Sequence, residues 1–86
     1  MAEINVFWTK TAVFQRNYIF SFWNKRNKST NYSQKLRVRI KERTDQLKVF
    51  PELGKKTDSK SVGVIFIEHY SILYIFMDNK IIVVGF

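Results

Sequence analysis

The sequence predicts an α+β fold in which a helical hairpin packs on a four-stranded, mainly antiparallel, twisted sheet. Three observations predict it: a short apolar run near the start, two long segments without glycine or proline, and three closely spaced apolar runs at the end. The expected order of elements is therefore β-α-α-β-β-β, with both helices on one face of the sheet. The 86 residues have the length of one domain, and we expect residues 1–86 to form it.

The first two elements are a strand and a helix with a wide apolar arc. Ile4 to Trp8 is expected to form the strand, and Thr9 or Thr11 can cap a helix over Ala12 to Arg26. At 100° per residue, the apolar side chains of this helix cover more of its circumference than one sheet contact needs. Either the arc is buried on two sides within the monomer, or part of it receives another protein.

A second helix is predicted from Asn31 to Val49, where Asn31 and Gln34 resemble a capping box. Its basic side chains spread over a broad face, which is more often solvated than a binding surface. Arg43 lies within the apolar stripe and is expected to extend past its edge or to pair with an acid. The stripe itself consists of Tyr32, Leu36, Ile40, Leu47 and Phe50.

A turn and a basic loop separate the helices from the last strands. Pro51 disfavours helix at the preceding residue and Gly54 supports a turn, so Lys55 to Lys60 is predicted as a loop. Reversals at Glu68-His69 and Asp78-Asn79 join the strands into a meander. The three strands are Val62 to Ile67, Tyr70 to Met77 and Ile81 to Phe86. The first of them is apolar at nearly every position, which indicates that both of its faces are at least partly covered.

The composition bounds the classes of function. The 15 Lys and Arg against 7 Asp and Glu give a net charge of +8, which favours a polyanionic or acidic partner over a merely solvated basic surface. No cysteine and one histidine disfavour a disulfide, a metal site or a nucleophilic triad, and we expect no cofactor. The start is not signal-like and no apolar run has bilayer length, so we expect a cytoplasmic protein without a membrane partner.

No motif identifies a reaction, and the remaining candidates are basic and aromatic. Lys55, Lys56 and Lys60 are candidates for binding phosphates. His69 can transfer protons but, as a single turn histidine, is more often structural. Tyr74 can keep its hydroxyl at an edge of the sheet. Such groups would suit metal-free cleavage of RNA, in which a base, a cation and an acid act on the ribose and the phosphate.

Tyr74 shares one face of its strand with Tyr70, Ile72 and Phe76, because side chains two apart point the same way. We expect this face to lie under the helices, with Ile72 and Phe76 in the core.

The chain resembles the RelE/ParE superfamily of bacterial type II toxins from Val6 to Phe86. The supporting segments are VFWTKTAVFQRNYIFSFW, IKERTDQLKVFPELGK and HYSILYIFMDNKIIVVGF, in that order and spacing. The resemblance implies a growth-inhibiting toxin that a cognate antitoxin wraps and neutralises in a hetero-oligomer. For antitoxin contact it nominates Phe14, Tyr18 and Phe22 on the first helix.

The resemblance implies one of two targets. RelE-like members cut messenger RNA on the ribosome without a metal, whereas ParE-like members inhibit DNA gyrase and are not enzymes. Ser71 stands where many members have an arginine, and RelE-like members carry further basic and aromatic residues beyond the position of Phe86. Both differences weaken the ribonuclease alternative and leave the catalytic residues unassigned. Of the candidate phosphate-binding residues, only Lys55 and Lys56 carry over from the family.

Two further readings come from other classes of protein. One is a non-toxic relative that has kept only its antitoxin-binding surface. The other is a general RNA-binding α+β domain, which ranks last because the strands lack the aromatic and basic motifs of such domains.

Overall fold

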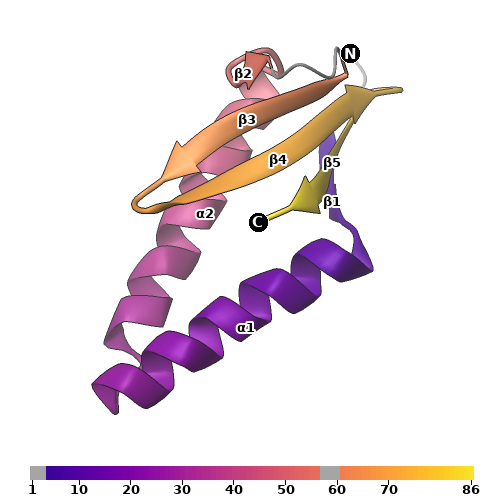
Figure 1. Ribbon diagram of the computed structural model, residues 1–86. Helices are drawn as coiled ribbons and strands as arrows, with labels where there is room; N and C mark the ends of the chain where they lie inside the picture. The colour runs from indigo at the N-terminus through magenta and orange to yellow at the C-terminus, as the bar shows by residue number, and fades with distance from the viewer. Residues whose placement is uncertain (1–3, 57–60) are drawn as a thin grey trace.

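The computed structural model describes residues 4–56 and 61–86, with two helices on one side of a five-stranded sheet (Figure 1). In chain order the elements are β1 (Asn5–Trp8), α1 (Lys10–Asn27), α2 (Asn31–Val49), β2 (Lys55–Lys56), β3 (Val62–Ile67), β4 (Tyr70–Met77) and β5 (Lys80–Gly85). The predicted α+β class and the order of its elements are confirmed, with one strand added. Among the described residues, no helix is long and apolar enough to cross a membrane.

The added strand is β2, in a segment that the sequence predicted as loop. Lys55 pairs with Val64 and Lys56 with Gly63, both antiparallel. The prediction of four strands was one short, because two adjacent lysines show none of the apolar alternation that marks a strand. The rest of the predicted loop, residues 57–60, lies outside the described residues.

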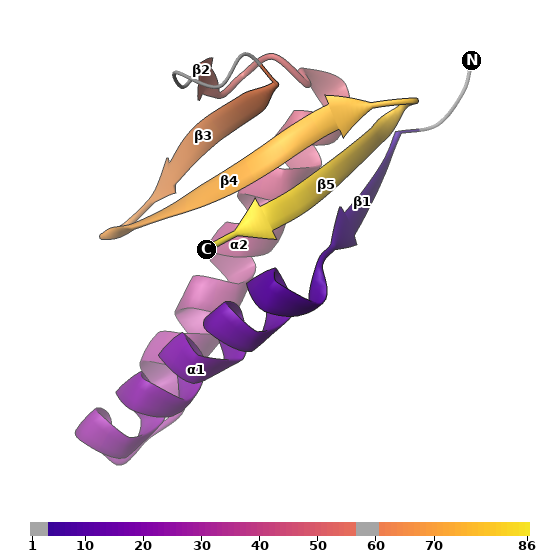
Figure 2. The same cartoon turned by 45° about the vertical axis from the view of Figure 1, so that its right-hand side comes forward.

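The strand order brings the first and the last strands together. It is β1-β5-β4-β3-β2, and only the β1–β5 pair is parallel, so the sheet is mainly antiparallel as predicted (Figure 2). The predicted reversal at Asp78-Asn79 is confirmed, and both residues have positive φ, 52° and 57°. Aspartate and asparagine tolerate this conformation better than most residues, which explains their use in a two-residue hairpin turn.

Threonines precede both helices. The hydroxyl of Thr9 accepts a hydrogen bond from the Ala12 N–H at 3.2 Å, which confirms one of the two predicted caps of α1. The predicted capping box of α2 is wrong, because the helix is preceded by Thr30 and Asn31 is already helical. Gln34 instead donates its side-chain amide to the Thr30 hydroxyl at 3.1 Å.

The core lies between the helices and the inner face of the sheet, the face turned toward them. It consists of Ala12, Phe20, Leu36, Ile40, Leu47, Ile65, Ile67, Ile72, Tyr74, Ile81 and Val83. The prediction for Ile72 is confirmed. Phe76 is 40% exposed, so its predicted placement in the core was wrong, and Phe50, predicted on the apolar stripe of the second helix, is 65% exposed. Arg43 donates to the Gln46 side-chain oxygen at 2.7 Å, and within residues 4–56 and 61–86 it pairs with no acid.

Candidate functional site

Tyr74 ties the turn after α2 to the sheet. Its hydroxyl donates to the Pro51 carbonyl at 2.8 Å and accepts from the Gly54 N–H at 3.0 Å, and the residue is 3% exposed. The ring lies against Gly63, its partner on β3, and against Gly54. A Cβ at either glycine would come within 2.6–2.7 Å of the ring, so both positions need glycine. Tyr74 therefore supports the turn that leads into β2, and its contact with a target stays a prediction.

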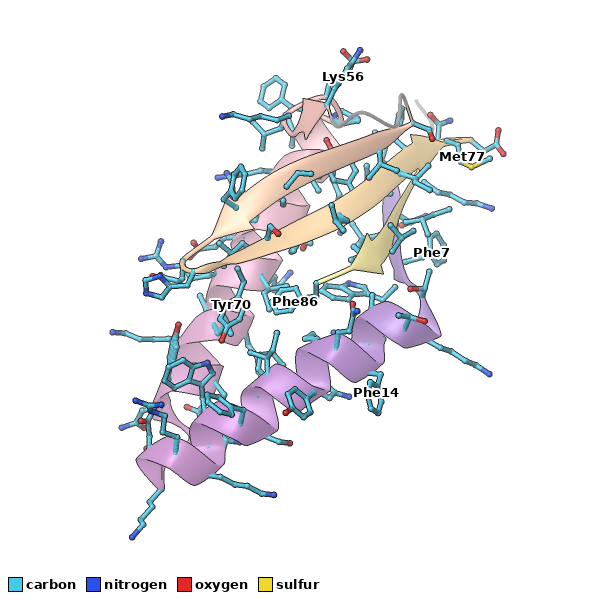
Figure 3. The ribbon with its side chains drawn as sticks, in the orientation of Figure 1. Phe7, Phe14, Lys56, Tyr70, Met77 and Phe86 are labelled. Atoms are coloured by element: carbon cyan, nitrogen blue, oxygen red, sulfur yellow. The ribbon has the colours of Figure 1, made fainter. Side chains whose placement is uncertain are left out.

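Among the described residues, the predicted target residues lie in two places, since Lys56 lines one pocket with Tyr74 whereas His69 lies apart from them. Lys55 and Lys56 form β2 at one edge of the sheet, and Figure 3 shows Lys56 at the far end from α1. His69 is an exposed residue of the β3–β4 turn, at the opposite end of β3. Because Lys56 pairs with Gly63 and β3 ends at Ile67, four strand steps, about 13 Å, separate Lys56 from the start of the turn that contains His69. Lys60 lies outside the described residues.

The sheet face turned away from the helices is apolar, and we call it the outer sheet face. It carries Phe7, Val62, Val64, Phe66, Leu73, Ile75, Met77 and Ile82, all exposed or half-buried. One row of these side chains crosses four strands, since Val62 pairs with Ile75, Ile75 with Ile82 and Ile82 with Phe7. Contiguous apolar surface of this kind marks a site of protein interaction.

Lysines flank the outer sheet face on two sides. The Lys55 ammonium lies 6.0 Å from the ring centre of Phe66, and that of Lys80 lies 5.9 Å from Phe7. Each lysine can therefore cover apolar surface with its stem while its charge stays at the rim. A partner with an apolar centre and acidic margins would fit this arrangement.

A second apolar surface follows α1, on its side away from α2. Phe14, Tyr18 and Phe22 are 72%, 66% and 45% exposed, and their spacing of four residues aligns them along the helix; we call them the α1 stripe. Phe14 points away from the sheet in Figure 3. A hollow of about 370 Å³ lies between this stripe and Phe86.

An aromatic cluster holds α1 in place beside the stripe. The Trp23 indole N–H donates to the Tyr70 hydroxyl at 2.6 Å, and the Trp23 ring packs edge-on against Tyr32 at 4.7 Å. The Tyr70 ring stacks on Phe86 at 5.8 Å. Burial, and then the neighbouring Tyr70 and Glu68, raise the pKa of the Tyr32 phenol, which therefore stays neutral at physiological pH. The cluster acts as packing that fixes the orientation of α1.

The outer sheet face was not identified from the sequence. The sequence feature that could have identified it is the nearly unbroken apolar run of β3. That run was interpreted as evidence that both faces of the strand are at least partly covered. The structure covers only one face, because both helices lie on the same side of the sheet. An unbroken apolar strand is therefore not always covered on both faces within the monomer.

Two comparisons with known proteins agree with this architecture. The model of the family described as the ParE toxin of the type II toxin–antitoxin system parDE matches residues 6–86. A solved structure described as a chromosomal ParDE toxin–antitoxin system from P. aeruginosa superposes with a TM-score of 0.77 at 15% identity, over 96% of this chain and 92% of that one. A search of curated protein sequences found no match. Since the family model spans nearly the whole sequence, the chain belongs to the ParE toxins of type II toxin–antitoxin systems.

Proposed function

We propose that this toxin arrests growth by binding DNA gyrase through the outer sheet face, without cleaving RNA. The observation that carries the proposal is the apolar character of that face. Its central rows consist of aliphatic and aromatic side chains, which can exclude water from a protein partner but cannot donate or accept a proton. The two lysines at its rim would add attraction for acidic groups of the target.

The positions of the candidate catalytic groups support binding over cleavage. General acid–base catalysis on RNA needs a base, an acid and a cation within hydrogen-bond reach of one phosphate. Among the described residues, His69 and the β2 lysines lie at opposite ends of β3, and the Tyr74 hydroxyl is already used by two backbone groups. We therefore favour gyrase over the ribosome as the target.

We further propose that a cognate antitoxin neutralises the toxin in a cytoplasmic complex by covering the α1 stripe. The stripe is apolar, exposed and next to the hollow at Phe86, which suits an amphipathic helix laid along α1. It lies on a different element from the outer sheet face. The antitoxin would therefore prevent binding of gyrase to the outer sheet face by steric hindrance, either from α1 or from a segment that extends across the end of β5.

The test of the function is inducible expression of the chain, with and without the gene encoded next to it. We expect growth arrest that the neighbouring gene rescues, loss of DNA supercoiling before translation falls, and inhibition of purified gyrase. Messenger RNA cleavage on translating ribosomes would replace this proposal by the ribonuclease alternative. Normal growth with folded protein would support the non-toxic relative.

The antitoxin surface can be tested separately. Changing Phe14 and Tyr18 to serine should weaken antitoxin binding by at least about 30-fold, which corresponds to a contribution of about 2 kcal/mol from the pair. The measurement is titration calorimetry with the purified antitoxin. The control changes Val38 and Val49 to serine, which removes comparably exposed apolar side chains from α2. Equal affinities of the two double variants would place the antitoxin elsewhere.

A further inference from the structure

A basic pocket lies between β1, α1 and α2, on the opposite side of α1 from the stripe. It has a volume of about 290 Å³, and its charged lining consists of Arg16, Arg37, Lys41, Lys48 and Asp45. Arg16 follows Phe14 by two helical positions, about 200° around the axis, so the pocket and the α1 stripe are separate surfaces. Four cations face one carboxylate, and the proposals made above for gyrase and the antitoxin use none of them.

Aromatic rings hold the two guanidinium groups of this pocket. The central carbon of the Arg16 guanidinium lies 4.7 Å from the ring centre of Trp8, and that of Arg37 lies 4.5 Å from Phe20. A guanidinium that lies over a ring keeps the N–H groups at its edge available for acceptors in its own plane. The two groups are therefore oriented before any ligand arrives.

Among the described residues, the donors of these arginines have few acceptors. The Nε atom of Arg16 is buried without a hydrogen bond, and its terminal nitrogen makes only a 3.5 Å contact with the adjacent Asn17. Within the described ranges, neither Arg16 nor Arg37 has a carboxylate within 4.0 Å. A buried donor without an acceptor costs free energy, and a ligand in the pocket that accepts from it would remove that cost.

The acid of the pocket, Asp45, already forms ion pairs with two lysines. Asp45 contacts Lys41 at 3.1 Å and Lys48 at 3.7 Å through its two oxygens. Burial lowers the pKa of Arg16, and the nearby charge of Arg37 lowers it further. An anion between the arginines would relieve the repulsion and supply the missing acceptors.

We propose that this pocket binds a phosphate group, free or carried by a nucleotide, between Arg16 and Arg37. Two guanidinium edges present several donors from two directions, and a phosphate offers acceptor oxygens on all sides together with a double negative charge. The volume of the pocket leaves room for the group to which the phosphate is attached. The site does not depend on the proposals for gyrase or the antitoxin.

The test measures the Tm of the isolated chain with inorganic phosphate, with AMP, and with sodium chloride at matched ionic strength. We expect phosphate to raise Tm saturably by more than chloride does, and the change of Arg16 and Arg37 to glutamine to remove the difference. The control changes Lys10 and Lys25 to glutamine, which alters the net charge equally at exposed positions of α1. If AMP and phosphate raise Tm equally, the pocket recognises the phosphate group alone. If AMP raises Tm more than phosphate does, the pocket recognises a nucleotide.

A second measurement uses the unmodified protein and therefore does not depend on whether a variant folds. In the unmodified chain, titration with phosphate should shift the NMR signal of the buried Arg16 Nε–H, since that proton would gain an acceptor. An unmoved signal, or a Tm rise no larger than that with chloride at matched ionic strength, would overturn the proposal. A phosphate effect that persists in the glutamine double variant would also exclude these two arginines.

Discussion

A toxin in which Phe66 and Leu73 are both changed to serine is expected to lose growth arrest while it stays folded. The two side chains are 58% and 37% exposed on neighbouring strands of the outer sheet face, so their loss removes little from the core. If each contributes about 2 kcal/mol at an apolar interface, the pair lowers affinity for the target by about three orders of magnitude. Colony counts after induction and inhibition of purified gyrase measure the effect.

Controls separate this loss of binding from misfolding. Antitoxin binding to the α1 stripe should persist in the double variant, because the stripe belongs to another element. The Val38 and Val49 double serine variant removes exposed apolar side chains from α2 and should remain toxic. Full toxicity of the Phe66 and Leu73 double variant would mean that the outer sheet face does not contact the target.

The change of Gly63 to alanine is expected to destabilise the fold, and to do so far more than the change of Gly85 to alanine. The added Cβ would lie 2.7 Å from the Tyr74 ring, which is buried and hydrogen-bonded at its hydroxyl and cannot withdraw. Overpacking of this kind costs about 1–3 kcal/mol or more, which lowers the Tm of a domain of this size by about 4–24 °C. Thermal unfolding followed by circular dichroism measures the change.

Gly85 provides the matched control. A Cβ there would meet the end of the Leu73 side chain at 3.0 Å, and Leu73 is partly exposed and free to move. Alanine at Gly85 should therefore cost much less than alanine at Gly63. If the two variants unfold at the same temperature, Tyr74 is not fixed as its contacts indicate.

The Tyr74 hydroxyl can be tested in the same assay. Its removal in Tyr74→Phe leaves the Gly54 N–H without its acceptor and should cost about 1–3 kcal/mol. The loss should be accompanied by faster hydrogen exchange of the Gly54 amide. An unchanged exchange rate would show that the turn is held by other contacts.

The sequence predicted the elements well where local chemistry determines them. The Asp78-Asn79 hairpin and the limits of α2 follow from turn residues and from Pro51, which act over a few positions. The exposure of Phe14, Tyr18 and Phe22 was consistent with the wide apolar arc of α1. These features need little knowledge of distant parts of the chain.

The remaining features depend on tertiary contacts that periodicity does not encode. Tyr74 was expected to keep its hydroxyl at an edge, but the fold places it under the turn between Pro51 and Gly54. Arg16 and Arg37 come from two different helices and line the same pocket. The residue spacing within either helix does not predict that they lie close together. The open outer sheet face arises because both helices pack on the same side, which an apolar strand pattern cannot indicate.

The parallel pairing of β1 with β5 also determines when the sheet can form during synthesis of the protein. Asn5 lies opposite Lys80, so the strand made first cannot pair until Lys80 and the residues after it in β5 have left the ribosome. At about 5–20 residues per second, this delay is on the order of seconds. The helical hairpin, with its stripe, depends on nearby residues and can form earlier, whereas the row from Val62 to Phe7 exists only after β5 has been added. A nascent chain would thus present the antitoxin surface before the surface that we assign to the target.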